Sequence, residues 1–167
     1  MKKATWLDEK QRTSFTERVK VLKPLVTGKV FPTLILQNPQ GNNVDVSQQK
    51  ARYKVILFYS PDCGHCKEAA PKLMQFYTTY GKAKNILIYN ISIDYEEDKW
   101  EKFITDYHTE PLINLWDAKQ AFVFRDRFDV YATPTSYILD ERNKIIAKRI
   151  PVEELERFLE FYERKNS

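Results

Sequence analysis

Cysteine is scarce in this sequence: its 167 residues include only two, at positions 63 and 66. A disulfide stabilises a fold mainly by closing a long loop, and a bridge across three positions closes almost nothing. The pair is therefore unsuited to holding the fold together, and redox or metal chemistry becomes the leading interpretation. Zinc normally takes four ligands, but there is no second cysteine pair, and only His65, between the cysteines, and His108 could add to this one. We expect redox chemistry and no metal.

Long apolar runs and a strong excess of one charge are also missing. No run approaches the roughly 20 apolar residues that a membrane-spanning helix requires. The opening Met1-Lys2-Lys3 resembles the charged start of a signal peptide, but residues 6–10 are polar and acidic, so the chain is either cytoplasmic or has lost a leader. The 27 Lys and Arg residues are interleaved with 23 Asp and Glu residues, which excludes the basic stripe typical of nucleic-acid-binding proteins.

What the chain does contain is a 43% share of hydrophobic residues, enough for one domain with a sizeable core. Their spacing alternates between helix and strand periods. Helices are expected over residues 8–23, from Cys63 to Gly81, over 121–129 and from Pro151 onward. Another is expected after Asp94, with Trp100, Phe103, Ile104 and Tyr107 on its apolar face. Strands are expected at 55–59, 86–93, 136–139 and 145–147, and a hairpin joins 33–36 to 44–46.

This order predicts an α/β fold with a central mixed sheet of about five strands flanked by helices, plus an N-terminal helix and β-hairpin. We expect a single domain over residues 1–167, with an extension at 1–52 and a core at 53–167. Phe15, Val19, Leu22 and Val26 would form the apolar face of the first helix. Asp94 and Glu97 resemble a capping box, and residues 108–120 are expected to be irregular.

The chemistry centres on Cys63, which stands where a strand gives way to a helix. Free N–H groups and the positive end of the helix dipole would point at its sulfur and stabilise a thiolate, the nucleophile in disulfide exchange. Cys66 follows one turn later on the same face, within reach to attack a mixed disulfide. Gly64 removes side-chain bulk beside the attacking sulfur, and a protonated His65 would add positive charge that favours the thiolate.

Two segments resemble a known family. Cys63-Gly64-His65-Cys66-Lys67-Glu68-Ala69-Ala70-Pro71 resembles the active-site helix of thioredoxins, and Tyr131-Ala132-Thr133-Pro134-Thr135 resembles their X-Pro-Thr segment. The likeness runs from about residue 53 to the C-terminus. The hairpin before it and the stretch 108–120 make the chain more similar to the TlpA/ResA-type branch of the thioredoxin-like superfamily.

The resemblance implies that Cys63 and Cys66 are the catalytic dithiol. It implies that Pro134 is cis and lies against that dithiol, and that the Thr133 backbone pairs with an extended substrate segment. It further implies a protein thiol or disulfide as substrate, a separate redox partner for recycling, no metal or organic cofactor, and a place in the cell envelope or periplasm.

Three positions depart from the family pattern. Asp62 stands where many relatives carry Trp, and a carboxylate there is expected to raise the pKa of Cys63. Leu57 occupies the place of the buried acid of thioredoxins, and Ala69 the place of an acid in some ResA-type proteins. Glu68 is the nearest candidate to accept the Cys66 proton, with water as the alternative.

The sequence thus predicts a thiol–disulfide oxidoreductase, with a reductase favoured because TlpA/ResA-type relatives are mostly reductants. A disulfide isomerase or oxidase is the alternative, since Gly-His also occurs between the cysteines of protein disulfide isomerases. A peroxidase of the peroxiredoxin class would need a Thr-Pro-X-X-Cys-type site, which Ser60-Pro61-Asp62-Cys63 does not match. The intact cysteine pair and Thr133-Pro134 argue against the remaining alternative, a non-catalytic interaction module.

Overall fold

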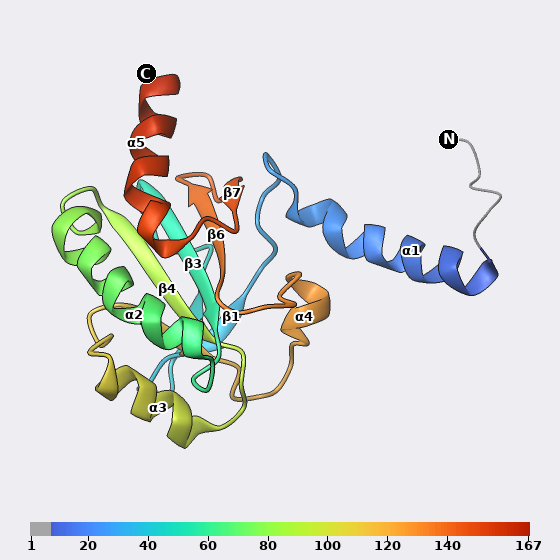
Figure 1. The fold of residues 1–167 in the computed structure, drawn as a ribbon, viewed down its shortest axis with the longest axis horizontal. Coiled ribbons are helices and arrows are strands. Elements are labelled where there is room, and N and C mark those ends of the chain that lie inside the picture. The colour runs from blue at the N-terminus through green and yellow to red at the C-terminus, as the bar shows by residue number, and fades with distance from the viewer. Residues whose placement is uncertain (1–7) are drawn as a thin grey trace.

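A run of seven buried residues forms β3 (Tyr53–Tyr59), an interior strand of the sheet. The computed structural model describes residues 8–167, and in it β3 pairs parallel with β4 and antiparallel with β6. The sheet has seven strands in the order β2-β1-β5-β4-β3-β6-β7 (Figure 1). The other strands are β1 (Ile35–Gln37), β2 (Asn43–Asp45), β4 (Ile86–Ser92), β5 (Ile113–Trp116), β6 (Thr135–Asp140) and β7 (Ile145–Lys148).

Successive side chains of β3 point to opposite faces of the sheet, and three helices cover the face to which the odd-numbered residues point. Tyr53, Val55 and Leu57 pack with α2 (Gly64–Phe76) and α5 (Leu155–Lys165), and Tyr59 packs with α3 (Glu97–Asp106). A π-helical turn (Tyr77–Gly81) extends α2, and the 3-10 turn η3 (Val152–Glu154) precedes α5.

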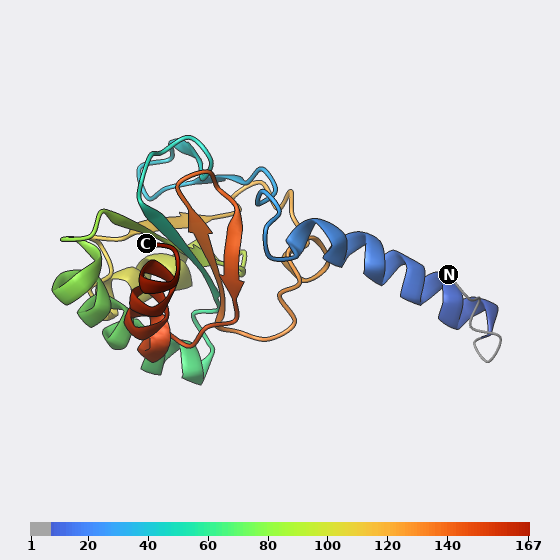
Figure 2. The ribbon, with the colours of Figure 1, turned by 90° about the horizontal axis from the view of Figure 1, so that it is seen from above.

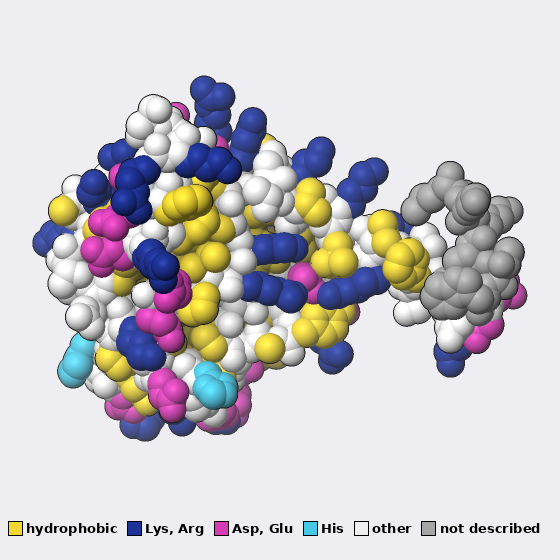
Figure 3. Space-filling model, turned by 45° about the horizontal axis from the view of Figure 1, so that its top comes forward, with side chains coloured by type: hydrophobic (Ala, Val, Ile, Leu, Met, Phe, Trp, Pro, Cys, Tyr) yellow, Lys and Arg dark blue, Asp and Glu magenta, His cyan; other side chains and the backbone are white. Residues whose placement is uncertain are grey.

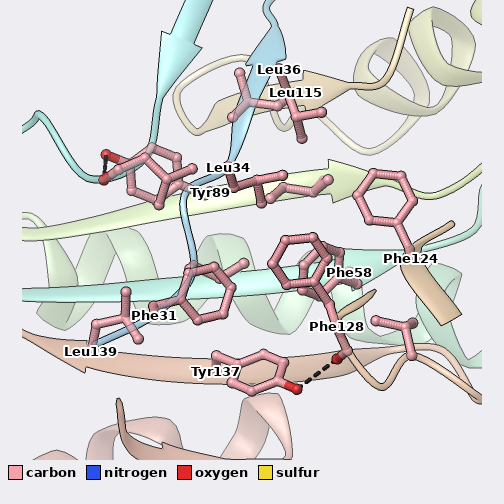
Figure 4. Close-up of a cluster of buried hydrophobic side chains, with 14 of the residues drawn as sticks. Phe31, Leu34, Leu36, Phe58, Tyr89, Leu115, Phe124, Phe128, Tyr137 and Leu139 are labelled. Carbon is pink, nitrogen blue, oxygen red and sulfur yellow. Dashed lines mark hydrogen bonds between the residues drawn. The ribbon is translucent and has the colours of Figure 1, made fainter. Parts of the chain in front are cut away.

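The opposite face holds a second core cluster. Phe58 lies among Phe31, Phe124 and Phe128, on the side covered by residues 25–34 and the short helix α4 (Phe124–Arg127) (Figure 4). The Tyr137 hydroxyl on β6 donates a hydrogen bond of 2.6 Å to the Phe128 carbonyl. This packing fixes the start of the loop that leads from α4 into β6.

Most predicted elements are confirmed, and the thioredoxin-like α/β architecture with its N-terminal helix is as expected. The interpretation of residues 108–120 as irregular is wrong, because β5 lies within them. Asn114 is 3% exposed on this strand and accepts a hydrogen bond from Asn90 on β4 at 3.0 Å. A buried polar pair of this kind interrupts the apolar run by which a buried strand is recognised.

The expected capping box before α3 is also absent. Glu96 is the N-cap residue of α3 and makes no side-chain capping hydrogen bond. Asp94 instead accepts a hydrogen bond of 2.6 Å from the Ser60 hydroxyl, which follows the end of β3. A partner from another element thus satisfies the carboxylate that local spacing assigned to the helix.

The N-terminal helix α1 (Glu9–Leu22) begins with a capping box formed by Asp8 and Gln11, and it extends away from the sheet (Figure 2). Its expected apolar face does not pack on the rest of the chain, since Phe15 is 59% and Val19 is 43% exposed. The contact with the core comes instead from Val21 at its C-terminal end. Leu25 in the connection that follows is also buried in this core, and Arg18 pairs with Asp129, so the C-terminal half of the helix is attached to the domain.

No helix among residues 8–167 has the length and hydropathy needed to cross a bilayer. Residues 1–7, on which the interpretation of Met1-Lys2-Lys3 depends, lie outside the described residues. The limits of a single domain over 1–167 stay a prediction.

Candidate redox site

Cys63 is the N-cap residue of α2, directly after the turn that ends β3. Its backbone N–H donates to the Ser60 carbonyl at 3.1 Å, and its sulfur accepts a hydrogen bond from the Cys66 backbone N–H at 3.3 Å. The sulfur therefore occupies the position from which a side chain satisfies the free N–H groups of a helix start. The placement expected from the sequence at the strand-to-helix junction is confirmed.

The two motifs that resemble the thioredoxin family meet at this sulfur. Thr133, 70 residues further along the chain, places its carbonyl oxygen 3.3 Å from Cys63 Sγ. The peptide bond between Thr133 and Pro134 is cis. The segment is held in place by the Thr135 hydroxyl, which donates to the Ala132 carbonyl at 2.6 Å. β6 begins at Thr135 beside β3, so the sheet itself brings this loop to the dithiol.

The two sulfurs have opposite ionisation tendencies. Burial favours the neutral Cys63 thiol, but hydrogen bonds from the Cys66 thiol, from the Thr133 side chain and from the backbone N–H groups of Cys66 and His65 outweigh it. Together they hold the pKa of Cys63 below the ordinary value. Cys66 is only 2% exposed, and its burial, followed by its hydrogen bond to Cys63, raises its pKa. The pair therefore consists of an accessible sulfur that ionises readily and a buried one that does not.

Asp62 does not act on Cys63 as the sequence analysis expected. Its carboxylate pairs with Lys99 on α3 at 2.7 Å, and this hydrogen bond lowers the pKa of Asp62. Lys99 also contacts Glu96 at 2.8 Å. The Asp62 side chain is 64% exposed and is not among the groups that shift the pKa of Cys63. The Lys99 ammonium and the surrounding water screen the charge that would have opposed the thiolate.

His65, Glu68 and Gly64 lie on the solvent side of the helix start. The His65 side chain is 86% exposed, with Nδ1 3.9 Å from the Glu68 carboxylate, so His65 reaches Cys63 through its backbone N–H. Glu68 is 76% exposed and is absent from the groups that act on Cys66, so the structure does not bring it to that thiol. A Cβ at Gly64 would meet no atom within 4 Å, which means that only an approaching partner would sense it.

Tyr59 is the residue of the site that sequence reasoning missed. Its ring packs in the same cluster as Cys66 and Trp100, and its buried hydroxyl has no hydrogen-bond partner among residues 8–167. Burial, followed by the charges of Cys66 and Asp94, raises the pKa of this phenol. In the sequence Tyr59 counts as one more apolar residue of β3, and nothing in its spacing points to the sulfur behind it.

A groove of about 400 Å³ lies beside the dithiol, between α2 and the segment that carries Pro134. Tyr131 and Arg149 form one wall, and His65, Glu68 and Lys72 on α2 form the other. The groove reaches His65 and Pro134, which are close neighbours in sequence of Cys63 and Thr133. Among residues 8–167 no three Cys, His, Asp or Glu side chains gather in an arrangement that could hold a metal ion.

Comparisons with known proteins agree with this fold. The chain is 35% identical to a domain of a possible thiol-disulfide isomerase from Cytophaga hutchinsonii. The TM-score is 0.80, over 85% of this chain and 96% of that domain. It is 32% identical over 109 residues to probable nucleoredoxin 1 of Arabidopsis thaliana, covering 64% of this chain and 18% of that protein. It is 22% identical over 136 residues to the thiol-disulfide oxidoreductase ResA of Bacillus cereus, covering 80% of this chain and 76% of ResA.

The chain therefore spans less than a fifth of the plant nucleoredoxin and about three quarters of ResA. The sequence pattern of the AhpC/TSA family matches residues 27–148, which include the cysteine pair, the Thr133–Pro134 segment and all seven strands. The last strand, β7, ends at the last matched residue. The chain belongs to the AhpC/TSA family, in its thioredoxin-like fold, with ResA among its relatives.

Proposed function

We propose that this protein is a thiol–disulfide oxidoreductase that exchanges disulfides with protein substrates through Cys63 and Cys66. The observation that carries the proposal is the asymmetry of the pair. Cys63 is accessible at a helix start and has a lowered pKa, whereas Cys66 is buried one turn behind it and has a raised pKa. That arrangement suits one sulfur to attack and the other to resolve. The names of the Cytophaga domain and of ResA agree with it.

In the proposed reaction the Cys63 thiolate attacks one sulfur of a substrate disulfide. A Cys63–substrate bond forms, the substrate S–S bond breaks, and the departing sulfur leaves as a thiolate that takes up a proton. Cys66 then loses its proton and attacks the Cys63 sulfur, which releases the second substrate thiol and leaves a Cys63–Cys66 disulfide. Two electrons have passed to the substrate. A separate redox partner returns the pair to the dithiol, and no metal or organic cofactor is needed.

Substrate docking is assigned to the backbone beside Pro134. The Thr133 carbonyl already lies 3.3 Å from Cys63 Sγ, so an extended substrate segment that pairs with this backbone would carry its own sulfur to Cys63. Strand-like pairing of this kind takes its affinity from main-chain hydrogen bonds and tolerates different side chains.

We propose that electrons pass from the Cys63–Cys66 dithiol to the substrate disulfide, which makes the protein a reductase, and that it acts in the cell envelope. The alternative, an isomerase or oxidase, is favoured by one observation: a stabilised Cys63 thiolate makes the dithiol form more stable and the pair more oxidising. Equilibration with glutathione buffers distinguishes the two. A potential below about −250 mV, near that of thioredoxin, supports the reductase, and one above about −200 mV, near that of protein disulfide isomerase, overturns it.

The activity itself is tested with a matched pair of variants in an insulin-reduction assay. The wild type should reduce insulin, and Cys63→Ser should lose both the reaction and every covalent adduct. Cys66→Ala should lose turnover but accumulate a mixed disulfide through Cys63, visible by mass and reversed by dithiothreitol. Adducts on Cys66 in the Cys63→Ser variant, or equal turnover by all three proteins, would overturn the proposal. A parallel incubation with peroxide and a reductant tests the peroxidase alternative.

A further inference from the structure

Two arginines flank one tyrosine beside the proposed substrate segment, and a third arginine shares a carboxylate with one of them. The guanidinium carbons of Arg18 on α1 and Arg125 on α4 lie 4.2 and 4.5 Å from the ring centroid of Tyr131. Arg18 and Arg149 both pair with Asp129, Arg149 at 2.7 Å. Figure 3 shows Lys and Arg side chains gathered where α1 meets the rest of the domain. We refer to Arg18, Arg125, Arg149 and Tyr131 as the basic cluster.

The charge of this cluster is not balanced. Asp129 is 4% exposed and is shared by two of the three arginines. Arg125 forms an ion pair with no carboxylate of residues 8–167, although Asp126 is its neighbour on α4. The opposite wall of the groove has no excess of positive charge, because Lys72 contacts Glu153 at 3.6 Å and Glu68 adds a second carboxylate. Two positive charges are thus left over on the Tyr131 side.

The cluster also keeps hydrogen-bond donors accessible, on the exposed side chains of Arg125 and Arg149. The Arg149 side chain is 57% exposed after its contact with Asp129, and the Tyr131 side chain beside it is also accessible, with 47% of the residue exposed. Guanidinium groups present their N–H donors in a planar fork that matches a carboxylate. An anionic group is therefore the ligand that this surface fits.

The distance to the reactive sulfur identifies where that anion would come from. Tyr131 precedes Thr133 by two residues, and Thr133 contacts Cys63. An extended chain advances about 3.3 Å per residue, so a segment paired along residues 131–133 would place its second or third residue from the cysteine beside Tyr131. A carboxylate on the substrate itself can therefore reach the cluster while the substrate sulfur is at Cys63.

We propose that the basic cluster selects protein substrates that carry Asp or Glu two or three residues from the reacting cysteine. The inference rests on the proposed function, since it places the substrate sulfur at Cys63. It assigns α1 a role in recognition, because Arg18 comes from that helix. The protruding helix would then serve as one wall of the substrate site, anchored there by Asp129.

The test uses two synthetic peptides with one cysteine, blocked as a disulfide with a small thiol. One peptide has Asp two and three positions from the cysteine, and the other has Asn at both positions. In the first set these residues precede the cysteine, and in a second set they follow it. With reduced wild-type protein in 20 mM salt, the Asp peptide of one set should react about tenfold faster than its Asn partner, with the ratio falling towards one in 500 mM salt.

Arg125→Glu should reduce the Asp:Asn rate ratio to about two or less. Lys82→Glu is the matched control, because it makes the same charge change at an exposed residue beyond the far end of α2. It should keep the tenfold ratio. A wild-type ratio near one, or equal losses in the two variants, overturns the proposal, since equal losses would reflect only net charge.

A binding measurement separates this inference from the proposed function. Fluorescent versions of the peptides with Ser in place of Cys cannot react, so their anisotropy reports recognition alone. Tighter binding of the Asp form, lost in Arg125→Glu, supports the cluster even if no peptide disulfide is exchanged. Binding to phosphatidylglycerol vesicles without preference for the Asp peptide would overturn it in favour of a membrane surface. Exchange of the Asn disulfide without any Asp preference leaves the oxidoreductase intact and rejects the inference.

Discussion

The opposite ionisation of the two cysteines predicts a strongly selective alkylation. The perturbation is iodoacetamide added to the reduced protein at pH 7. The pKa of Cys66 is raised to about 12 and that of Cys63 lies below 9.0, a difference of at least three pH units. At pH 7 the thiolate fraction of Cys63 should therefore exceed that of Cys66 by ~10³ or more.

Intrinsic nucleophilicity works against this ratio and sets its lower bound. A thiolate of higher pKa is the stronger nucleophile. With a Brønsted slope of 0.4 to 0.5, a pKa difference of three units makes the Cys66 thiolate about 20-fold more reactive than the Cys63 thiolate. Ionisation alone then leaves Cys63 at least ~50-fold faster, by the same principles. Burial adds to the difference, because Cys66 is 2% exposed.

Peptide mapping by mass spectrometry at timed intervals measures both rates. The alkylation rate at Cys63 should rise with pH, and the midpoint of that rise should lie at a lower pH than for an ordinary cysteine, because the pKa of Cys63 is lowered. In 6 M guanidinium the two sites should react alike, which controls for reagent bias. Cys66→Ala removes the hydrogen bond from the Cys66 thiol, so the Cys63 midpoint should move to higher pH. A native ratio near one, or alkylation of Cys66 first, would refute the reasoning.

Three further predictions concern stability, measured by urea unfolding. Asn tolerates the positive φ of 57° at position 129, but Asp129→Asn weakens two arginine contacts and should lower the free energy of unfolding by about 1–3 kcal/mol. The exposed Asp126→Asn is the control, and an equal loss in both variants would contradict this prediction. Lys54→Met leaves the Val46 carbonyl and the Asn143 amide oxygen, each 2.7 Å from Nζ, without their donor. It should cost about 2–4 kcal/mol, whereas the exposed Lys50→Met should cost little. Tyr59→Phe removes a buried hydroxyl that has no partner, so stability should hold or rise by up to ~1 kcal/mol; a clear loss would show that the hydroxyl is bonded.

The sequence by itself was enough to predict the core of the fold. β3 is a continuous apolar run, α2 begins where that run ends, and Trp100 and Phe103 repeat at helical spacing, so each element could be identified from neighbouring residues. The dithiol was predicted on the same basis, because the position of a cysteine at a helix start is a local property. Local periodicity is strong in these segments since they are buried on a regular face.

The errors arose where a residue has its partner in another element. β5 was missed because Asn114 pairs with Asn90 across the sheet, and the capping role given to Asp94 failed because Ser60 binds its carboxylate. Asp62 was expected to oppose the Cys63 thiolate, but Lys99, 37 residues away in sequence, neutralises it. Spacing along a chain contains no information on such distant partners.

What the sequence determined is therefore the identity and local setting of the reactive pair, together with most strands and helices. The tertiary structure decided which groups surround that pair. They are the Thr133 carbonyl at the sulfur, the Tyr59 hydroxyl, which has no partner among residues 8–167, behind Cys66, and the two arginines over Tyr131 with a third that shares Asp129. The physical reason is that electrostatic and hydrogen-bond energies depend on distance and burial in space, which arise only once β3, β6 and the helices have packed together.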